Sequence, residues 1–241
     1  MAQEALEKTK GIVDIVFLLD VSGSMQPSIN ALRDNINSFV DSLATPDANG
    51  GSPVKDWRIK VSGYRDSMAD GQQWWVDFPF ATSIAEVKSN LASLEAKGGG
   101  DEPESLLDAL FKISTMPSTE RMDAPNPNMW RHRHSAARVV IFFTDATYHP
   151  KVSIPEAKGA TVDDVGREIQ NARIILVGYC PEHDCYQDLA AVDRSILEFV
   201  GDMSNAVQAM VEYTSDPNHF RQALAALAKT VSQSADTAVA L

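Results

Sequence analysis

The chain of 241 residues has few cysteines, a deficit of positive charge and no long apolar run, and each shortage excludes a class of protein. Two cysteines are too few for a disulfide scaffold, so we expect reduced thiols in an intracellular setting. The 21 basic residues face 33 acidic ones, a net charge of −12, whereas nucleic acids and anionic membranes bind basic surfaces. No apolar stretch reaches the roughly 18 residues of a membrane span, and residues 1–11 lack the apolar core of a signal peptide.

What the sequence has instead is an alternation of strand-like and helix-like segments. Continuous apolar runs predict buried strands, and apolar residues at every third or fourth position predict helices. The expected strands are the run ending at Asp20 and residues 57–64, 137–144 and 173–179, with a short edge strand in 74–80. The expected helices are one that begins at Pro27 and those at 83–96, 102–116, 161–171 and 216–234. Residues 186–200 are expected to be helical in parts, and 207–213 fit either a last strand or a helix.

This alternation predicts an α/β fold with a mostly parallel central sheet and helices on both faces. At this length we expect a single domain over residues 12–234, preceded by an extension, 1–11, and followed by a tail, 235–241. An irregular insertion that contains several prolines is expected at about 117–135.

The most informative stretch lies where the first strand passes into the first helix. The apolar strand stops at Asp20, and two hydroxyls follow at every second position, Ser22 and Ser24, with Gly23 between them. Ligands of open α/β sheets bind at the carboxyl ends of the strands. One carboxylate and two hydroxyls are hard oxygen ligands, which suit a divalent cation such as Mg²⁺, with Mn²⁺ or Ca²⁺ as alternatives.

Two later segments add acidic residues. Three glycines precede Asp101, Glu102 and Glu104, and these acids open the helix predicted at 102–116, where the helix dipole would stabilise them. Taken alone, acids this dense favour an ordinary solvated helix start over a ligand site. The strand predicted at 137–144 again ends at a carboxylate, Asp145. Three loops, each following an apolar element, are thus expected to meet at one edge of the sheet.

The run from Asp20 to Ser24 resembles the Asp-x-Ser-x-Ser motif of von Willebrand factor A (vWA) domains, a module shared with integrins. The resemblance implies a Rossmann-like vWA fold and a metal-ion-dependent adhesion site, in which Asp145 completes the set of ligands. Many vWA domains have a threonine in the intervening loop. Here the loop is similar to that of integrin β chains, which implies Glu104 beside the primary ion, and Asp101 and the Pro103 carbonyl beside a second cation.

Other residues near this edge have weaker assignments. Asp66 follows another strand and is expected either to support a second cation or to form a salt bridge with a basic neighbour. Gly23, Thr147 and Tyr148 are candidates for a rim that contacts a partner, and His149 is expected to be an ordinary loop residue. The two cysteines, at 180 and 185, do not supply the four ligands of a structural zinc site.

The sequence favours an interaction module over an enzyme. A phosphatase of the haloacid dehalogenase type needs a second aspartate where Ser22 stands, and no serine-hydrolase or P-loop motif is present. We therefore expect a protein that binds an Asp or Glu of a protein partner through a divalent cation, without nucleic acid or a membrane span. We expect it to be a cytoplasmic assembly, scaffold or signalling component. Extracellular adhesion to a matrix or cell-surface protein, and metal-dependent hydrolysis, remain the alternatives.

Overall fold

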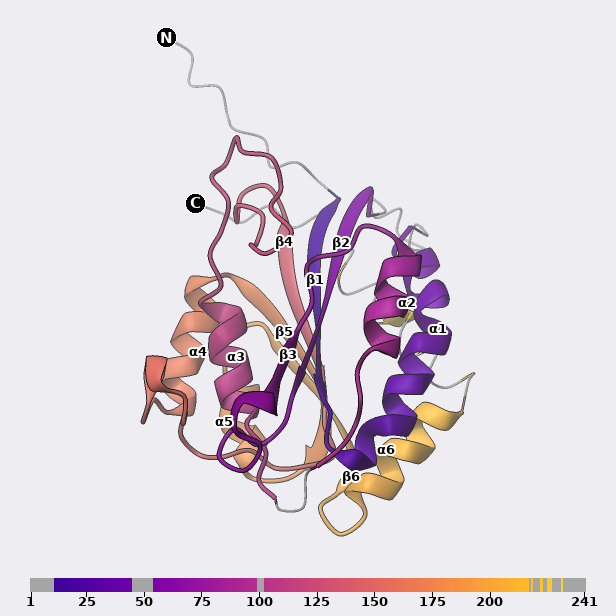
Figure 1. The fold of residues 1–241 in the computed structure, drawn as a ribbon, viewed down its shortest axis with the longest axis vertical. Helices are drawn as coiled ribbons and strands as arrows, with labels where there is room; N and C mark the ends of the chain where they lie inside the picture. The colour runs from indigo at the N-terminus through magenta and orange to yellow at the C-terminus, as the bar shows by residue number, and fades with distance from the viewer. Residues whose placement is uncertain are drawn as a thin grey trace.

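The computed structural model describes residues 11–44, 54–98 and 102–216, together with Asn218, Gln222, Ala225, Ala226 and Val231. Within these residues, six strands form one sheet in the order β3-β2-β1-β4-β5-β6 (Figure 1). The strands are β1 (Ile12–Asp20), β2 (Asp56–Tyr64), β3 (Trp75–Asp77), β4 (Ala137–Phe143), β5 (Ile174–Glu182) and β6 (Ser195–Asp202). All neighbouring strands are parallel except β3, which runs antiparallel to β2 at one edge. The predicted α/β class is confirmed.

Helices cover both faces of the sheet, as expected. One layer contains α1 (Gln26–Ala44), α2 (Ile84–Ala92) and α6 (Ala206–Ser215), and the other contains α3 (Leu106–Ser114), α4 (Val162–Asn171) and α5 (Cys185–Ala190) (Figure 1). None of the helices in the described ranges is long and apolar enough to span a membrane.

Strand β1 lies in the middle of the sheet and shows why its sequence is continuously apolar. Phe17 and Leu19 belong to the core beneath α1, whereas Val16 and Leu18 belong to the core on the opposite face. Both sets of side chains are buried, so alternation between apolar and polar residues is absent. This double burial fixes the position of the loop that follows Asp20.

Two predicted elements differ from the structure. The segment 186–200 is helical in part, as predicted, since it contains most of α5, but residues 195–202 form the edge strand β6, which the sequence did not predict. The apolar residues of this strand, at 196, 197, 199 and 200, do not alternate with polar ones, so the sequence lacks the period that marks a strand. The helix predicted at 102–116 begins only at Leu106, because Glu104 is extended and pairs with Tyr148.

The remaining predictions concern the C-terminal part. Residues 207–213, which fitted a strand or a helix, lie in α6. Most of the helix predicted at 216–234 lies outside the described residues, as do residues 1–10 of the extension and all of the tail.

A buried ionic cluster fastens the insertion 117–135 to the sheet at the end opposite Asp20. Asp14, near the start of β1, is fully buried and accepts two hydrogen bonds from the Arg58 guanidinium, at 3.0 and 2.6 Å. The backbone N–H of Arg131, in the insertion, donates to Asp14 Oδ2 at 2.8 Å. The insertion contains no helix or strand, as predicted, and these contacts supply the order that regular structure would otherwise give.

Candidate metal centre

The candidate site lies at the carboxyl ends of the neighbouring central strands β1 and β4. From β1 the strands are added toward one edge of the sheet, and from β4 onward they are added toward the other edge. Asp20 is the last residue of β1, and Asp145 follows β4 by two residues. Open α/β sheets bind ligands at this kind of reversal because the two loops diverge and leave a crevice.

Asp20 is fully buried, and both of its carboxylate oxygens accept hydrogen bonds. The backbone N–H of Ser22 donates to Oδ1 at 2.8 Å, and the Thr144 hydroxyl donates to Oδ2 at 2.7 Å. Burial raises the pKa of Asp20 to about 6, and the nearby charge of Asp145 adds to the rise. The hydrogen bond from Thr144 holds the Asp20 carboxylate in position. The sequence reasoning missed this role, although a polar residue ends the apolar strand there.

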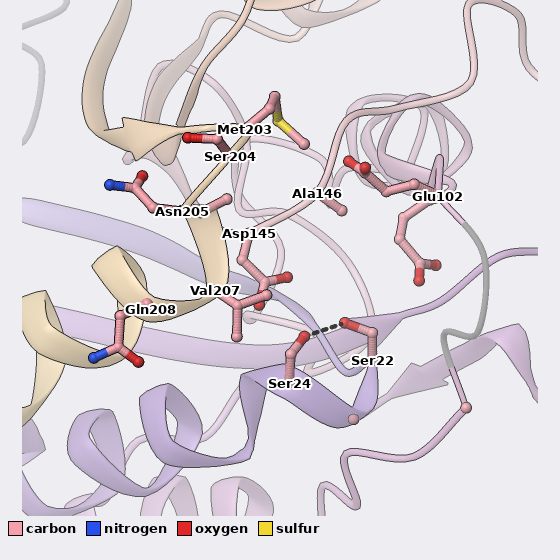
Figure 2. Close-up of a pocket in the computed structure, with 14 residues that line it drawn as sticks. Ser22, Ser24, Glu102, Asp145, Ala146, Met203, Ser204, Asn205, Val207 and Gln208 are labelled. Carbon is pink, nitrogen blue, oxygen red and sulfur yellow. Dashed lines mark hydrogen bonds between the residues drawn. The ribbon is translucent and has the colours of Figure 1, made fainter.

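The two serine hydroxyls of the motif lie side by side. A single turn of 3-10 helix, Gly23–Met25, follows Ser22 and brings its hydroxyl within 3.4 Å of that of Ser24. Figure 2 shows both hydroxyls on the side of the loop that faces Asp145. Their arrangement presents two neutral oxygen ligands in one direction.

Glu104 reaches the same site from the loop before α3. Its backbone N–H donates to the carbonyl of Thr147 at 3.0 Å, and its carbonyl accepts from the N–H of His149 at 3.0 Å, so the loops after β4 and before α3 are joined. The side chain is only 2% exposed. Burial, together with the charges of Asp20 and Asp66, raises the pKa of Glu104 to about 9.

Two carboxylate oxygens in the site have no hydrogen-bond partner among the described residues. They are Glu104 Oε2 and Asp145 Oδ2, and Asp145 is 6% exposed. Burial also raises the pKa of Asp145. Buried oxygen acceptors usually have hydrogen-bond donors, and burial makes these carboxylates hard to ionise. Both features are expected of a site whose bound positive charge is not present. A divalent cation fits this donor set, which consists only of hard oxygen atoms.

The carboxylates alone do not make the site. In the described part of the chain, no three Asp, Glu, His or Cys side chains converge closely enough to chelate an ion. A cation held here would therefore need the hydroxyls of Ser22 and Ser24 as well, and water molecules would complete its shell, as is usual for Mg²⁺.

The site opens into a hollow of about 590 Å³. One wall carries Ser22, Ser24, Glu104 and Asp145, and the other is the segment from Met203 to Gln208 (Figure 2). The sequence did not predict this second wall, because the residues between β6 and α6 are uncharged and match no pattern of metal ligands. Its position depends on the pairing of β6 with β5, which the sequence did not reveal.

The secondary candidates fall into different groups. Asp66 Oδ1 lies 3.0 Å from His149 Nε2 and also accepts the N–H of Met68 at 2.8 Å. Of the two roles expected for Asp66, a second cation or a basic neighbour, the structure shows the basic neighbour, His149. Asp101 lies outside the described residues, and Pro103 belongs to the extended loop before Glu104.

The three rim candidates also differ. Gly23 is exposed and lines the hollow, and Thr147 is half-buried, with its N–H donating to the Glu102 carboxylate at 2.7 Å. Tyr148 was wrongly assigned to the rim: it is only 6% exposed, and its hydroxyl donates to the carbonyl of Cys185. An aromatic side chain with one polar group favours this buried, hydrogen-bonded position. Cys180 and Cys185 are both free thiols.

The family model of the von Willebrand factor type A domain matches residues 14–193, about three quarters of the sequence. This chain belongs to the von Willebrand factor type A domain family. The matched range includes Asp20, Ser22, Ser24, Glu104 and Asp145, and it ends before the wall formed by residues 203–208.

Solved structures of two other proteins are similar to this chain at low sequence identity, and those of the first show the same fold. Proximal thread matrix protein 1 (PTMP1) from the mussel byssus is 16% identical, with a TM-score of 0.51 over 88% of this chain and 49% of that one. A second PTMP1 structure, with a zinc-occupied MIDAS motif, is 13% identical with a TM-score of 0.50 over the same shares. The pilus adhesin SpaC from Lactobacillus rhamnosus GG is 14% identical, with a TM-score of 0.48 over 91% of this chain and 30% of that one.

The chain thus spans about half the length of the PTMP1 structures and less than a third of the adhesin. No curated protein sequence matches it closely enough to count as a relative.

Proposed function

We propose that this vWA domain is a protein-interaction module, not an enzyme, and that it binds an acidic residue of a partner through a divalent cation. The observation that carries the proposal is a pair of buried carboxylate oxygens, on Glu104 and Asp145, that find no hydrogen-bond donor among the described residues and lie beside two serine hydroxyls. Positive charge bound there would satisfy the oxygens and lower the pKa values that burial has raised.

Each residue has a distinct part in this proposal. Ser22 and Ser24 bind the cation directly, because their hydroxyls face the hollow as neighbours. Asp20 and Asp145 bind it directly or through water, and Glu104 supplies further negative charge from the second loop. A cation with mostly neutral direct ligands keeps enough positive charge to accept a partner's carboxylate as its last ligand.

The family relation supports the same function. PTMP1, which shares the fold, has been solved with zinc in its MIDAS motif, and that motif is a metal-ion-dependent adhesion site. The donor set here consists only of oxygen, without a histidine or thiol ligand among the residues described at the site, so we propose Mg²⁺ as the ion, with Mn²⁺ or Ca²⁺ as substitutes.

Thermal unfolding in EDTA, followed by addition of Mg²⁺, Mn²⁺ or Ca²⁺, tests the metal site. A ligand that binds only the folded state stabilises it by about 2.7 kcal/mol at a concentration one hundred times its Kd. We expect Mg²⁺ to raise the melting temperature of the wild type and to leave a Ser22→Ala/Ser24→Ala variant unchanged.

A matched control is Ser42→Ala, which removes a half-buried serine hydroxyl in the last turn of α1, at the end of that helix away from Ser24 and outside the hollow. It should retain the full response to Mg²⁺. Equal responses of the wild type and the double serine variant, or no response of either at millimolar metal, would contradict the proposed site.

A further inference from the structure

The two walls of the hollow differ in chemistry. The wall of Ser22, Glu104 and Asp145 carries oxygen ligands and negative charge. The opposite wall, from Met203 to Gln208, consists of uncharged residues (Figure 2). A group that bridges the hollow therefore meets a cation site on one side and a neutral surface on the other.

The neutral wall includes the N-terminus of α6, a helix of ten residues. The first N–H groups of a helix have no carbonyl acceptor within it, and the side chain of Asn205 does not cap them. Asp145, which is 94% buried and has one oxygen without a hydrogen-bond donor among the described residues, lines the same hollow. A partner's carboxylate between the cation and α6 would have favourable electrostatics on both sides.

The same wall carries apolar surface that has no function within the domain. Val207, in the first turn of α6, is 49% exposed, one of few large apolar side chains of the described residues with such exposure. Figure 2 shows its side chain between Asp145 and Ser24, on the side of the hollow that the half-buried Met203 also lines. An apolar group placed next to a bound carboxylate would cover the Val207 side chain and remove its surface from water.

We propose that the site recognises an acidic residue whose neighbour in the partner sequence is apolar, and that Val207 selects that neighbour. This inference rests on the proposed function and narrows it from any exposed Asp or Glu to a two-residue feature. Acidic residues are abundant on protein surfaces, so the carboxylate alone would give the domain little power to choose a partner.

Short synthetic peptides test the proposal with the full chain. Each peptide has a central Glu in a Gly/Ser background, with Leu or Ser on either side of it, and a matched peptide has Gln in place of Glu. Binding of the fluorescently labelled peptides is followed by polarisation in Mg²⁺ and in EDTA. The proteins are the wild type, Val207→Ser and Ile196→Ser; Ile196 is also 49% exposed but lies on β6 outside the hollow.

We expect the wild type to bind a Glu-Leu peptide about tenfold more tightly than the Glu-Ser peptide, equivalent to about 1.4 kcal/mol. Val207→Ser should lose this preference while its melting temperature still rises with Mg²⁺, and Ile196→Ser should retain it. A wild type that binds all Glu peptides equally, or a preference that persists in Val207→Ser, overturns the inference and leaves the metal function intact. Absence of both Mg²⁺-dependent peptide binding and a Mg²⁺-induced rise in melting temperature overturns the inference and the proposed function together.

Discussion

Replacing Glu104 by Gln should make the metal-free domain more stable at neutral pH. Burial and neighbouring carboxylates raise the pKa of Glu104 from its usual 4.5 to about 9. The folded state then keeps a proton that the unfolded state has already released, so stability falls as the pH rises from about 4.5 to about 9. Gln keeps nearly the same shape without a titrating group, and it therefore avoids this loss.

The size of the effect follows from the two pKa values. At pH 7 the pH is about 2.5 units above the pKa of this carboxyl in the unfolded state. Each unit lowers the free energy of unfolding by about 1.4 kcal/mol, so the ionisable group costs the folded state ~3 kcal/mol. Part of the rise in the pKa of Glu104 comes from repulsion by Asp20, which can itself take up a proton. We therefore expect Glu104→Gln alone to raise the free energy of unfolding by about 2–3 kcal/mol. For a domain of this size each kcal/mol shifts the melting temperature by about 2–4 °C.

Thermal melts in EDTA between about pH 5 and pH 8 measure this difference. The wild type and Glu104→Gln should unfold at similar temperatures near pH 5, and the variant should gain stability over the wild type as the pH rises. Addition of Mg²⁺ should raise the melting temperature of the wild type more than that of the variant, because Gln brings no negative charge to the cation. Melting curves that run parallel over the whole pH range would refute the reasoning.

Three further substitutions test a hydrogen bond at the site, the buried ionic cluster at the opposite end of the sheet and the packing of β5. Thr144→Val removes the donor to Asp20 Oδ2, and should cost about 1–2 kcal/mol in urea unfolding and reduce the Mg²⁺-induced rise in melting temperature. Arg58→Met removes the two guanidinium hydrogen bonds to the buried Asp14 and leaves it, as ionic partner, only the more distant Arg131 Nε, at 3.5 Å, so it should cost about 3–5 kcal/mol in urea unfolding. Gly178→Ala places a methyl group 2.1 Å from the Phe142 ring and should cost about 1–3 kcal/mol in a thermal melt.

Each substitution has its own control. Thr147→Val changes a half-buried threonine near the site that does not bond to Asp20, and a Mg²⁺ response as weak as that of Thr144→Val would remove the special role of Thr144. For the ionic cluster, a loss below about 1 kcal/mol would show that Asp14 remains satisfied without Arg58. Phe142→Ala should recover part of the stability lost in Gly178→Ala; a purely additive double variant would contradict the steric explanation.

The sequence predicted the central strands and the first ligands because burial and chemistry both leave local patterns. Strands β1 and β4 are covered on both faces, so their apolar runs are unbroken, and each run ends at the residue that begins the site. Ser83 and Glu86 likewise mark the start of α2, where the Ser83 hydroxyl accepts the Glu86 N–H as a helix cap.

The parts that were missed depend on long-range pairing. Glu104 was placed in a helix because acids often begin helices, yet its backbone is held extended by Thr147 and His149, which lie more than forty residues later. The role of Thr144 depends on the distance between two strands, and the wall at Val207 depends on the position of β6. No spacing within one segment encodes such contacts.

The hydrogen bond between Thr144 and Asp20 joins residues 124 positions apart, across the parallel pair β1 and β4. Contacts between residues so distant in the chain form late in folding, because closing a large loop is entropically costly. We therefore expect the cation site to be complete only after the two halves of the sheet have met, because a fragment that ends before β4 lacks Thr144, Asp145 and the wall from Met203 to Gln208. In a refolding experiment, the time at which metal binding appears would therefore report when β1 and β4 pair, and it could be measured separately from the formation of helices.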